Sequence, residues 1–301
     1  MQKTVLVLVG PTAVGKTELA IQLAAHFGTS VISADSRQCY RLLNIGVAKP
    51  SSFDLARVPH YFIDTHDIEA DVNAAVFEQY ALDITEKLFA KHDIVIMAGG
   101  TGLYVDAFCN GLDALPKVPS TIRTAIRAGY DAEGIAWLTE RLKVKDPLYA
   151  EKGAMQNPQR MMRALEIVEA TGKSILMFQK AKKVIRPFRI IKAGLDLPRA
   201  LLYNRINQRV GHMMEAGLLE EVKYLQHYAH CNALQTVGYK ELFAYLEGAV
   251  SLDEAVDQIK QHTRNYAKRQ LTWFKKDASI TWFSPGDSAQ LLQWVEKEVD
   301  N

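Results

Sequence analysis

The stretch that decides the fold is TVLVLV (residues 4–9) followed directly by GPTAVGKT (residues 10–17). The six apolar residues predict a short strand buried on both faces of a parallel sheet. The next eight match the complete P-loop pattern, and Lys16–Phe27 has the apolar spacing of a helix. A strand, a glycine-rich loop and a helix in this order indicate a phosphate-binding α/β protein.

The P-loop pattern predicts how a phosphate group is bound. Its glycines let successive backbone N–H groups point at phosphate oxygens, and the N-terminus of the following helix adds partial positive charge. Lys16 is expected to reach the terminal phosphate, and the Thr17 hydroxyl is placed to bind Mg²⁺. A chance glycine-rich turn is the plain alternative, and the flanking strand and helix argue against it. The predicted diphosphate-binding residues are Gly10, Thr12, Ala13, Val14, Gly15, Lys16 and Thr17.

The rest of the chain divides into three parts. Further buried strands are predicted at residues 31–34 and 93–98, with a helix at 73–92 between them, which is the alternation of a doubly wound α/β core. From residue 113 the pattern becomes helical, and a strand returns only at 188–193. Helices are predicted at 121–127, 134–143 and 158–171, then at 199–216, 218–227, 239–247 and 252–275, and residues 279–283 fit a last strand. We therefore expect an α/β fold with a P-loop-containing, doubly wound parallel sheet. Its predicted parts are a first core segment (1–112), a basic helical insertion (113–187) and a second core segment (188–301).

Charge is unevenly distributed along the chain. The net charge is only +2, from 36 Lys and Arg and 34 Asp and Glu. Residues 113–192, however, hold 16 basic and 8 acidic side chains, whereas both flanking segments are slightly acidic. A basic segment of this kind fits a partner with a phosphate backbone, and it fits a solvated helical surface equally well.

The composition indicates the cellular compartment in which the protein is expected. Cys39, Cys109 and Cys231 lie far apart and have neither metal-ligand spacing nor a disulfide pattern. The chain has no run of 18 uncharged apolar residues, and its first residues lack the features of a secretory signal. We therefore expect a cytoplasmic protein with no membrane span, and a monomer by default.

A carboxylate follows the second predicted strand. Asp35 lies at the carboxyl end of residues 31–34, the edge at which ligands bind in doubly wound sheets. It could bind Mg²⁺ through water, accept a proton from an attacking nucleophile, or cap the next helix. The strand at 93–98 ends at Ala98-Gly99 without the Mg²⁺-binding aspartate of most P-loop NTPases, which disfavours an ordinary ATPase or GTPase.

Several segments together carry a family resemblance. The ordered set resembles tRNA dimethylallyltransferases, also called tRNA isopentenyltransferases, and it spans residue 5 to about residue 275. Its segments are the P-loop, ISADSRQCY (32–40), GVAKP (46–50), PHYFID (59–64), GGTGLY (99–104), NPQR with RALE (157–166), QTVGYKE (235–241) and TRNYAKRQLTWF (263–274).

The resemblance implies an enzyme that transfers the dimethylallyl group of dimethylallyl diphosphate to N6 of an adenosine in tRNA. That adenosine lies on the 3′ side of the anticodon, so the implied partners are the anticodon stem-loop and the prenyl donor. Diphosphate leaves, Mg²⁺ assists, and the target base is extruded into a channel. The fold it implies is the P-loop core with a helical insertion domain.

The resemblance also assigns residues by position. It implies that Asp35 is the general base, that Lys16 and Thr101 act near the diphosphate, and that Arg205 reaches the diphosphate from the second half of the core. On spacing alone, Thr101 is equally a helix cap, and Arg205 and Arg209 fit a solvated helix face. The implied tRNA contacts are Asp35, Ser36, Arg37, Gln38, Thr101, Arg123, Gln159, Arg160, Met161, Met162 and Arg163.

The sequence departs from the family pattern at three positions. Cys39 replaces an aliphatic residue, Val47 a threonine, and Gly211 an acidic residue that would be a partner for Arg209. An adenylate isopentenyltransferase shares the early motifs, and a small-molecule P-loop kinase would use Asp35 against the γ-phosphate of ATP. A non-catalytic RNA-binding module is the remaining alternative.

Overall fold

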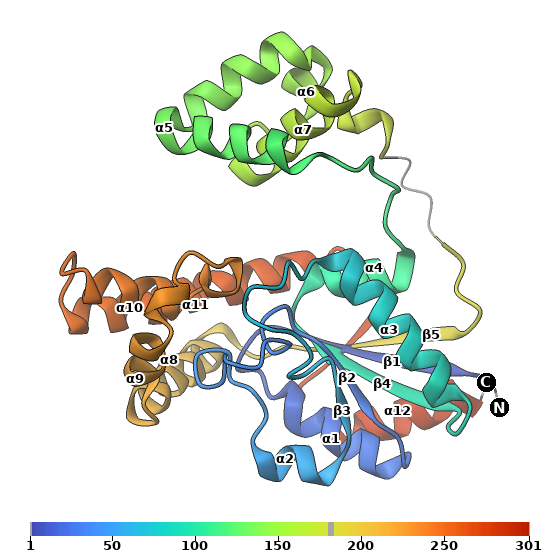
Figure 1. Cartoon of the computed structure of the whole chain (residues 1–301). Helices are drawn as coiled ribbons and strands as arrows, with labels where there is room; N and C mark the ends of the chain where they lie inside the picture. Colours follow the sequence, from blue (N-terminus) through green and yellow to red (C-terminus); the bar gives the residue numbers. More distant parts are fainter. Residues whose placement is uncertain (1, 180–183, 301) are drawn as a thin grey trace. The chain divides into compact units, whose positions relative to one another are not determined.

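The computed structural model describes residues 2–179 and 184–300 and divides the chain into two compact units (Figure 1). The first, here called the core unit, joins Met1–Cys109 to Ile185–Asn301. The second, the helical unit, is Asn110–Val184. It begins and ends three residues earlier than the predicted insertion 113–187. Residues 180–183, which fall inside that insertion, lie outside the described residues.

A six-stranded, wholly parallel sheet organises the core unit, and the predicted α/β architecture is confirmed. The strand order is β3-β2-β4-β1-β5-β6, so β1 is central and consecutive strands are joined by crossovers. The short edge strand β3 is the one strand of the sheet that the sequence pattern did not predict. The strands are β1 (Thr4–Val9), β2 (Val31–Ala34), β3 (His60–Tyr61), β4 (Ile94–Gly99), β5 (Arg189–Leu195) and β6 (Ile280–Phe283).

Helices cover both faces of this sheet, because alternate residues of each strand point to opposite sides. Val5, Val7 and Val9 of β1 pack on the face covered by α3 (Ala74–Phe89) and α4 (Gly102–Asn110). Leu6 and Leu8 pack on the face covered by α1 (Lys16–His26) and α12 (Ser288–Asp300). The continuous apolar run of β1 therefore reflects burial on both faces.

The remaining helices of the core unit surround the carboxyl edge of the sheet or its periphery. They are α2 (Ser52–Arg57), α8 (Arg199–Glu215), α9 (Leu218–Tyr224), α10 (Tyr239–Leu246) and α11 (Leu252–Phe274). The sequence predicted helices α8 to α11 to within a few residues, but it predicted neither α2 nor α12. In the described part of the chain, no helix is long and apolar enough to cross a bilayer.

The helical unit is built from α5 (Ser120–Lys145), α6 (Pro147–Lys152) and α7 (Pro158–Thr171) around its own apolar core. Leu138 and Leu142 of α5 pack with Met161 and Leu165 of α7. The two predicted helices 121–127 and 134–143 are one element with a kink at Gly134, whose φ of 72° lies in the left-handed region. The unit therefore has the independent core expected of a separate domain.

Strand register brings three loops together at one edge of the sheet. Val9 of β1 pairs with Gly99 of β4, and Gly99 pairs with Ala34 of β2. The P-loop, the Gly100–Thr101 turn and Asp35 follow these residues directly in the sequence. Since all three strands end at the same level, their loops form one continuous rim.

Candidate active site

The P-loop has the backbone conformation of an anion cradle. Ala13 and Gly15 have φ values of 63° and 111°, so neighbouring N–H groups turn toward one side of the loop. At Gly10 a side chain would place its Cβ 2.7 Å from the carbonyl oxygen of Leu195, so only glycine fits. No side chain of the described residues caps the N-terminus of α1, which leaves its N–H groups for a bound anion.

Lys16 lies inside this cradle, and carbonyl groups of the loop itself accept its hydrogen bonds. Its Nζ donates to the carbonyl oxygens of Gly10 at 3.0 Å and Pro11 at 2.7 Å. Burial and, secondarily, the positive charge of Arg209 lower the pKa of the Lys16 ammonium to about 7, while Asp35 acts in the opposite direction. The charge of Lys16 is therefore poorly compensated by the protein, which is the condition under which a bound phosphate group stabilises it.

Two arginines of α8 lie beside the cradle, in different roles. Arg209 lines the cavity and donates from Nη1 to the Thr12 hydroxyl at 3.2 Å; burial lowers the pKa of its guanidinium. Arg205 is exposed, and its Nη1 donates to the carbonyl oxygen of Val14 at 3.1 Å. Arg205 thus supports the loop from outside, and its contact with the diphosphate stays a prediction. Arg209 was not among the predicted site residues, yet it is the arginine within the cavity lining.

Asp35 caps a turn after β2, whereas the alternative considered for it was the cap of a helix. Its Oδ1 accepts the backbone N–H groups of Arg37 at 2.8 Å and Gln38 at 3.3 Å, which fixes the turn after β2. Within the described part of the chain, the second carboxylate oxygen accepts no hydrogen bond. Because Asp35 also lines the cavity, it has the capacity to accept a proton there.

Thr101 joins the rim loops to one another. Its hydroxyl oxygen accepts the N–H of Ser36 at 3.1 Å, and its carbonyl oxygen accepts the N–H groups that begin α4. The Tyr266 phenol of α11 lies close enough to this hydroxyl for the hydroxyl to lower the phenol's pKa slightly. Burial and the charge of Asp35 raise the pKa of Tyr266 to about 12, so this phenol stays neutral beside Asp35. Thr101 is therefore a helix-start residue that supports the loop carrying Asp35, whereas the described linings of the cavities do not include it. Its role near the diphosphate stays a prediction.

A buried amide connects the P-loop to the turn before Thr101. Gln270 of α11 is only 6% exposed. Its Oε1 accepts the N–H of Thr12 at 2.8 Å, and its Nε2 donates to the carbonyl oxygen of Gly100 at 2.9 Å. Two loops that follow different strands are thus held by one side chain.

The segment 44–49 forms the opposite wall of the site. The Glu221 carboxylate of α9 accepts the backbone N–H groups of residues 44–46 at 2.8–3.2 Å and the Tyr239 hydroxyl at 2.6 Å. The Gln38 side chain accepts from the Ser33 hydroxyl at 3.0 Å and donates to the carbonyl oxygens of residues 47 and 48 at 3.3 and 3.0 Å. The wall is therefore fixed at both ends, and Gln38, predicted to contact tRNA, already uses its amide within the protein.

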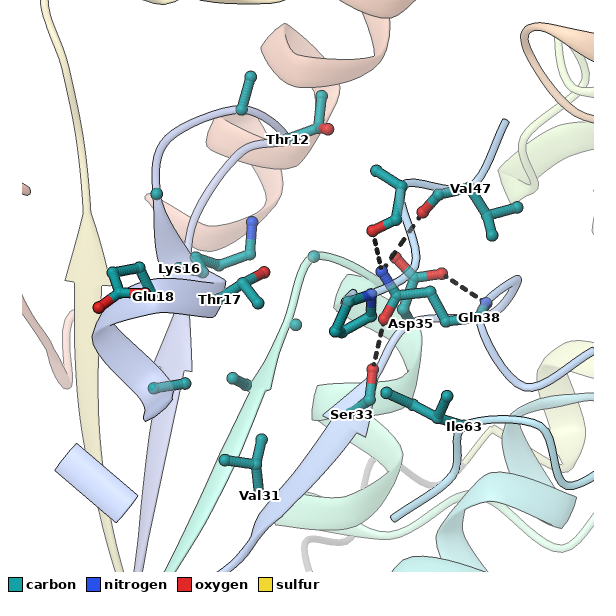
Figure 2. Close-up of a pocket in the computed structure, with 18 of the residues that line it drawn as sticks. Thr12, Lys16, Thr17, Glu18, Val31, Ser33, Asp35, Gln38, Val47 and Ile63 are labelled. Carbon is teal, nitrogen blue, oxygen red and sulfur yellow. Dashed lines mark hydrogen bonds between the residues drawn. The ribbon is translucent and has the colours of Figure 1, made fainter. Parts of the chain in front are cut away.

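Two cavities adjoin at Asp35. One, of about 290 Å³, is lined by Lys16, Thr17 and other P-loop residues; Figure 2 shows these two across from Asp35 and Gln38. The second, of about 220 Å³, has a largely apolar lining. Both share Asp35, Arg209 and Tyr266 in their linings. The cavity that contains the phosphate cradle and a more apolar one thus meet at a carboxylate. The apolar lining residues are Val47, Val210, Met213, Leu218, Val237 and Ile259.

The remaining predicted RNA contacts belong to the helical unit. Arg123 and Arg163 both approach Glu166, at 3.8 and 2.9 Å, and Gln159 and Arg160 are exposed at the start of α7. Met161 and Met162 require correction. Their side chains are 0% and 6% exposed because they occupy the inner face of α7, so they support the helix and offer no contact surface.

The lining residues that sequence reasoning missed include three with long polar side chains, Arg209, Tyr266 and Gln270. Tyr266 and Gln270 are one helical turn apart, on the same side of α11 as the buried residues Ala267 and Phe274. That spacing was available as a signal, but a glutamine on a helix is more often exposed. Arg209 offered no signal beyond its charge.

Relatives with assigned names match nearly the whole chain. A protein named tRNA dimethylallyltransferase 1 from Bacteroides thetaiotaomicron is 46% identical over 292 residues, which cover 97% of this chain and 95% of that protein. A tRNA dimethylallyltransferase from Cytophaga hutchinsonii is 44% identical over 299 residues, covering 99% and 98%.

Solved structures of enzymes with related names are also similar to this chain. The tRNA isopentenylpyrophosphate transferase of Bacillus halodurans is 34% identical with a TM-score of 0.74, covering 99% of this chain and 97% of that one. A eukaryotic dimethylallyltransferase, described as acting on tRNA, is 28% identical with a TM-score of 0.78, covering 97% of this chain and 75% of that one. The family model described as IPP transferase matches residues 38–277, more than half of the chain, and the chain therefore belongs to the IPP transferase family.

Proposed function

We propose that this enzyme transfers a dimethylallyl group from dimethylallyl diphosphate to N6 of the adenosine on the 3′ side of a tRNA anticodon. The observation that carries the proposal is the meeting of the phosphate cradle and the apolar cavity at Asp35, in a chain of this family. The names of its relatives support the same donor group and the same kind of acceptor.

The P-loop side of the site is suited to the donor. The backbone N–H groups at the start of α1 and the Lys16 ammonium would bind the diphosphate. Arg209, which lines the same cavity, would add a second positive charge. These groups stabilise the negative charge that develops on the diphosphate oxygen bonded to the allylic carbon as that C–O bond breaks.

The Asp35 side is suited to the acceptor. The N6 nitrogen would form a bond to the allylic carbon, and the electron pair of the C–O bond would leave with the diphosphate. Asp35 would take the proton that N6 loses, as a general base within hydrogen-bond reach. The Thr101 hydroxyl accepts the Ser36 N–H and so helps to fix the loop that carries Asp35, which limits the reorganisation of the base during transfer.

The residues present fit a bound Mg²⁺. Thr17 lines the cavity together with Lys16 and Asp35, and its hydroxyl is a suitable hard-oxygen ligand. Among the described residues there is no cluster of three or more His, Cys, Asp or Glu side chains that could hold a metal ion. This agrees with Mg²⁺ that is bound by few protein groups, with water and phosphate oxygens completing its shell. When bound, Mg²⁺ supplies charge neutralisation on the leaving diphosphate.

We propose that the anticodon stem-loop contacts both units. In the core unit the candidate contacts are Ser36, Arg37 and Gln38, beside the base that reacts. In the helical unit they are Arg123, Gln159, Arg160 and Arg163, where guanidinium groups would bind backbone phosphates.

The test is a transfer assay with radiolabelled dimethylallyl diphosphate and unmodified tRNA, followed by mass spectrometry of the tRNA nucleosides. We expect label in tRNA, release of diphosphate, and a prenylated adenosine. Label in free AMP but not in tRNA would instead identify an adenylate isopentenyltransferase. Phosphorylation that depends on ATP, without diphosphate release, would identify a kinase.

A further inference from the structure

The Gln270 amide joins parts of the chain that are remote in sequence. Its two partners, Thr12 and Gly100, are 258 and 170 positions away. Both hydrogen bonds are of ordinary length, at 2.8 and 2.9 Å, and the side chain is buried. The Thr12 N–H is only a donor and the Gly100 carbonyl only an acceptor, so the partners fix which end of the amide faces which loop.

The fit around this amide is tight. A side chain at Gly100 would place its Cβ 2.2 Å from Nε2 of Gln270. One helical turn earlier, the Tyr266 phenol of the same helix lies near the Thr101 hydroxyl. Helix α11 therefore holds both the P-loop and the turn after β4 through Gln270, and Tyr266 lies beside the same turn.

We propose that Gln270 is a positioning residue that sets the separation between the diphosphate cradle and the loop beside the acceptor. The inference rests on the proposed transfer reaction. Gln270 clamps the first part of the P-loop at Thr12, whereas donor binding depends on Lys16 and on the N–H groups at the start of α1. Removal of the clamp therefore alters alignment across the site and leaves the anion-binding end in place.

Gln270→Met tests this separation of effects, because methionine has a similar length and no hydrogen-bonding amide. We expect kcat to fall about 10- to 100-fold, since misalignment of about 1 Å has an effect of that size. The KM for dimethylallyl diphosphate should change less than about threefold. Hydrogen exchange at the Thr12 amide should become faster, a readout that needs no substrate.

Gln270→Glu gives a second readout that a merely structural role does not predict. The protonated carboxyl group reproduces both hydrogen bonds, because its O–H donates to Gly100 and its other oxygen accepts from Thr12. The ionised form loses the donor and places negative charge against the Gly100 carbonyl. Burial raises the pKa of the new carboxyl group, so the activity of this variant relative to the original enzyme should recover as pH is lowered.

Val295→Ala is the matched control. Val295 is fully buried in α12 and is absent from the lining of either cavity, so its truncation should lower Tm without changing kcat or KM. Gln270→Met with unchanged kcat, or Gln270→Glu with the same relative activity at every pH, would overturn the positioning role. If the original enzyme transfers no dimethylallyl group to tRNA, the proposed function fails, while faster exchange at Thr12 still tests the clamp.

Discussion

Lys16 predicts a specific pH dependence of donor binding. In the unliganded protein its pKa is lowered to about 7, by burial first and by Arg209 second. At that value only about one tenth of the molecules carry the ammonium at pH 8, and about one hundredth at pH 9. A bound diphosphate favours the charged form and raises the pKa again. Donor binding above pH 7 therefore requires proton uptake, and the apparent affinity should fall about tenfold per pH unit above pH 8.

Titration calorimetry with dimethylallyl diphosphate between about pH 7 and pH 9 measures this effect. In two buffers with different heats of ionisation, the difference in binding heat gives the number of protons taken up, which should approach one near pH 8.5. Lys16→Arg is the control, because a guanidinium stays charged throughout this range and should abolish the slope.

Arg209→Met should move the loss of affinity to higher pH, because Arg209 lowers the pKa of Lys16. An affinity that stays constant from pH 7 to pH 9, with no proton uptake, would refute the reasoning. It would mean that the Lys16 ammonium is already charged in the empty cradle.

Three further results are expected. Asp35→Asn keeps an oxygen for the turn but cannot accept a proton, so kcat should fall about 100- to 10,000-fold in the tRNA transfer assay; an unchanged kcat would remove the general-base role. Glu221→Ala leaves three N–H groups and the Tyr239 hydroxyl without their acceptor. The Glu221→Ala substitution should lower the free energy of unfolding in urea by about 2 kcal/mol, whereas Tyr239→Phe should lower it by about 1 kcal/mol. Equal losses would show that Glu221 does not stabilise the segment 44–49. Lys16→Met should raise Tm of the empty protein below pH 7, where the buried ammonium is charged in the folded state. Because the folded pKa is lower than the unfolded one, the gain should shrink from pH 7 upward; a gain independent of pH would count against the lowered pKa.

The central strands and the P-loop could be predicted because their signals are local. The apolar run of β1 and the glycines after it specify a buried strand and a tight anion loop without reference to the rest of the chain. Strand β3 has only two residues, too few to show a period. Helix α12 did carry a readable spacing in Leu291, Val295 and Val299, which the sequence prediction left unused.

The side chains that complete the site could not be predicted in the same way. Arg209 is chemically identical to an arginine on a solvated helix, and only the packing of α8 against the P-loop places it in the cavity. Met161 and Met162 show the converse error. Gln159 and Arg160, just before them, are exposed, but helical geometry turns these two side chains inward.

The long reach of Gln270 has a consequence for the order of folding. Contacts between distant parts of a chain form late, because closing a long loop carries a larger entropic cost. The P-loop is specified within the first residues, yet its clamp arrives from α11, 258 positions later. The backbone N–H groups of residues 44–46 likewise cannot form their hydrogen bonds until Glu221, at least 175 positions later, has packed against them. A partly folded chain therefore has the phosphate loop without the supports that align it, so transfer activity, more than donor binding, reports that the whole core unit has folded.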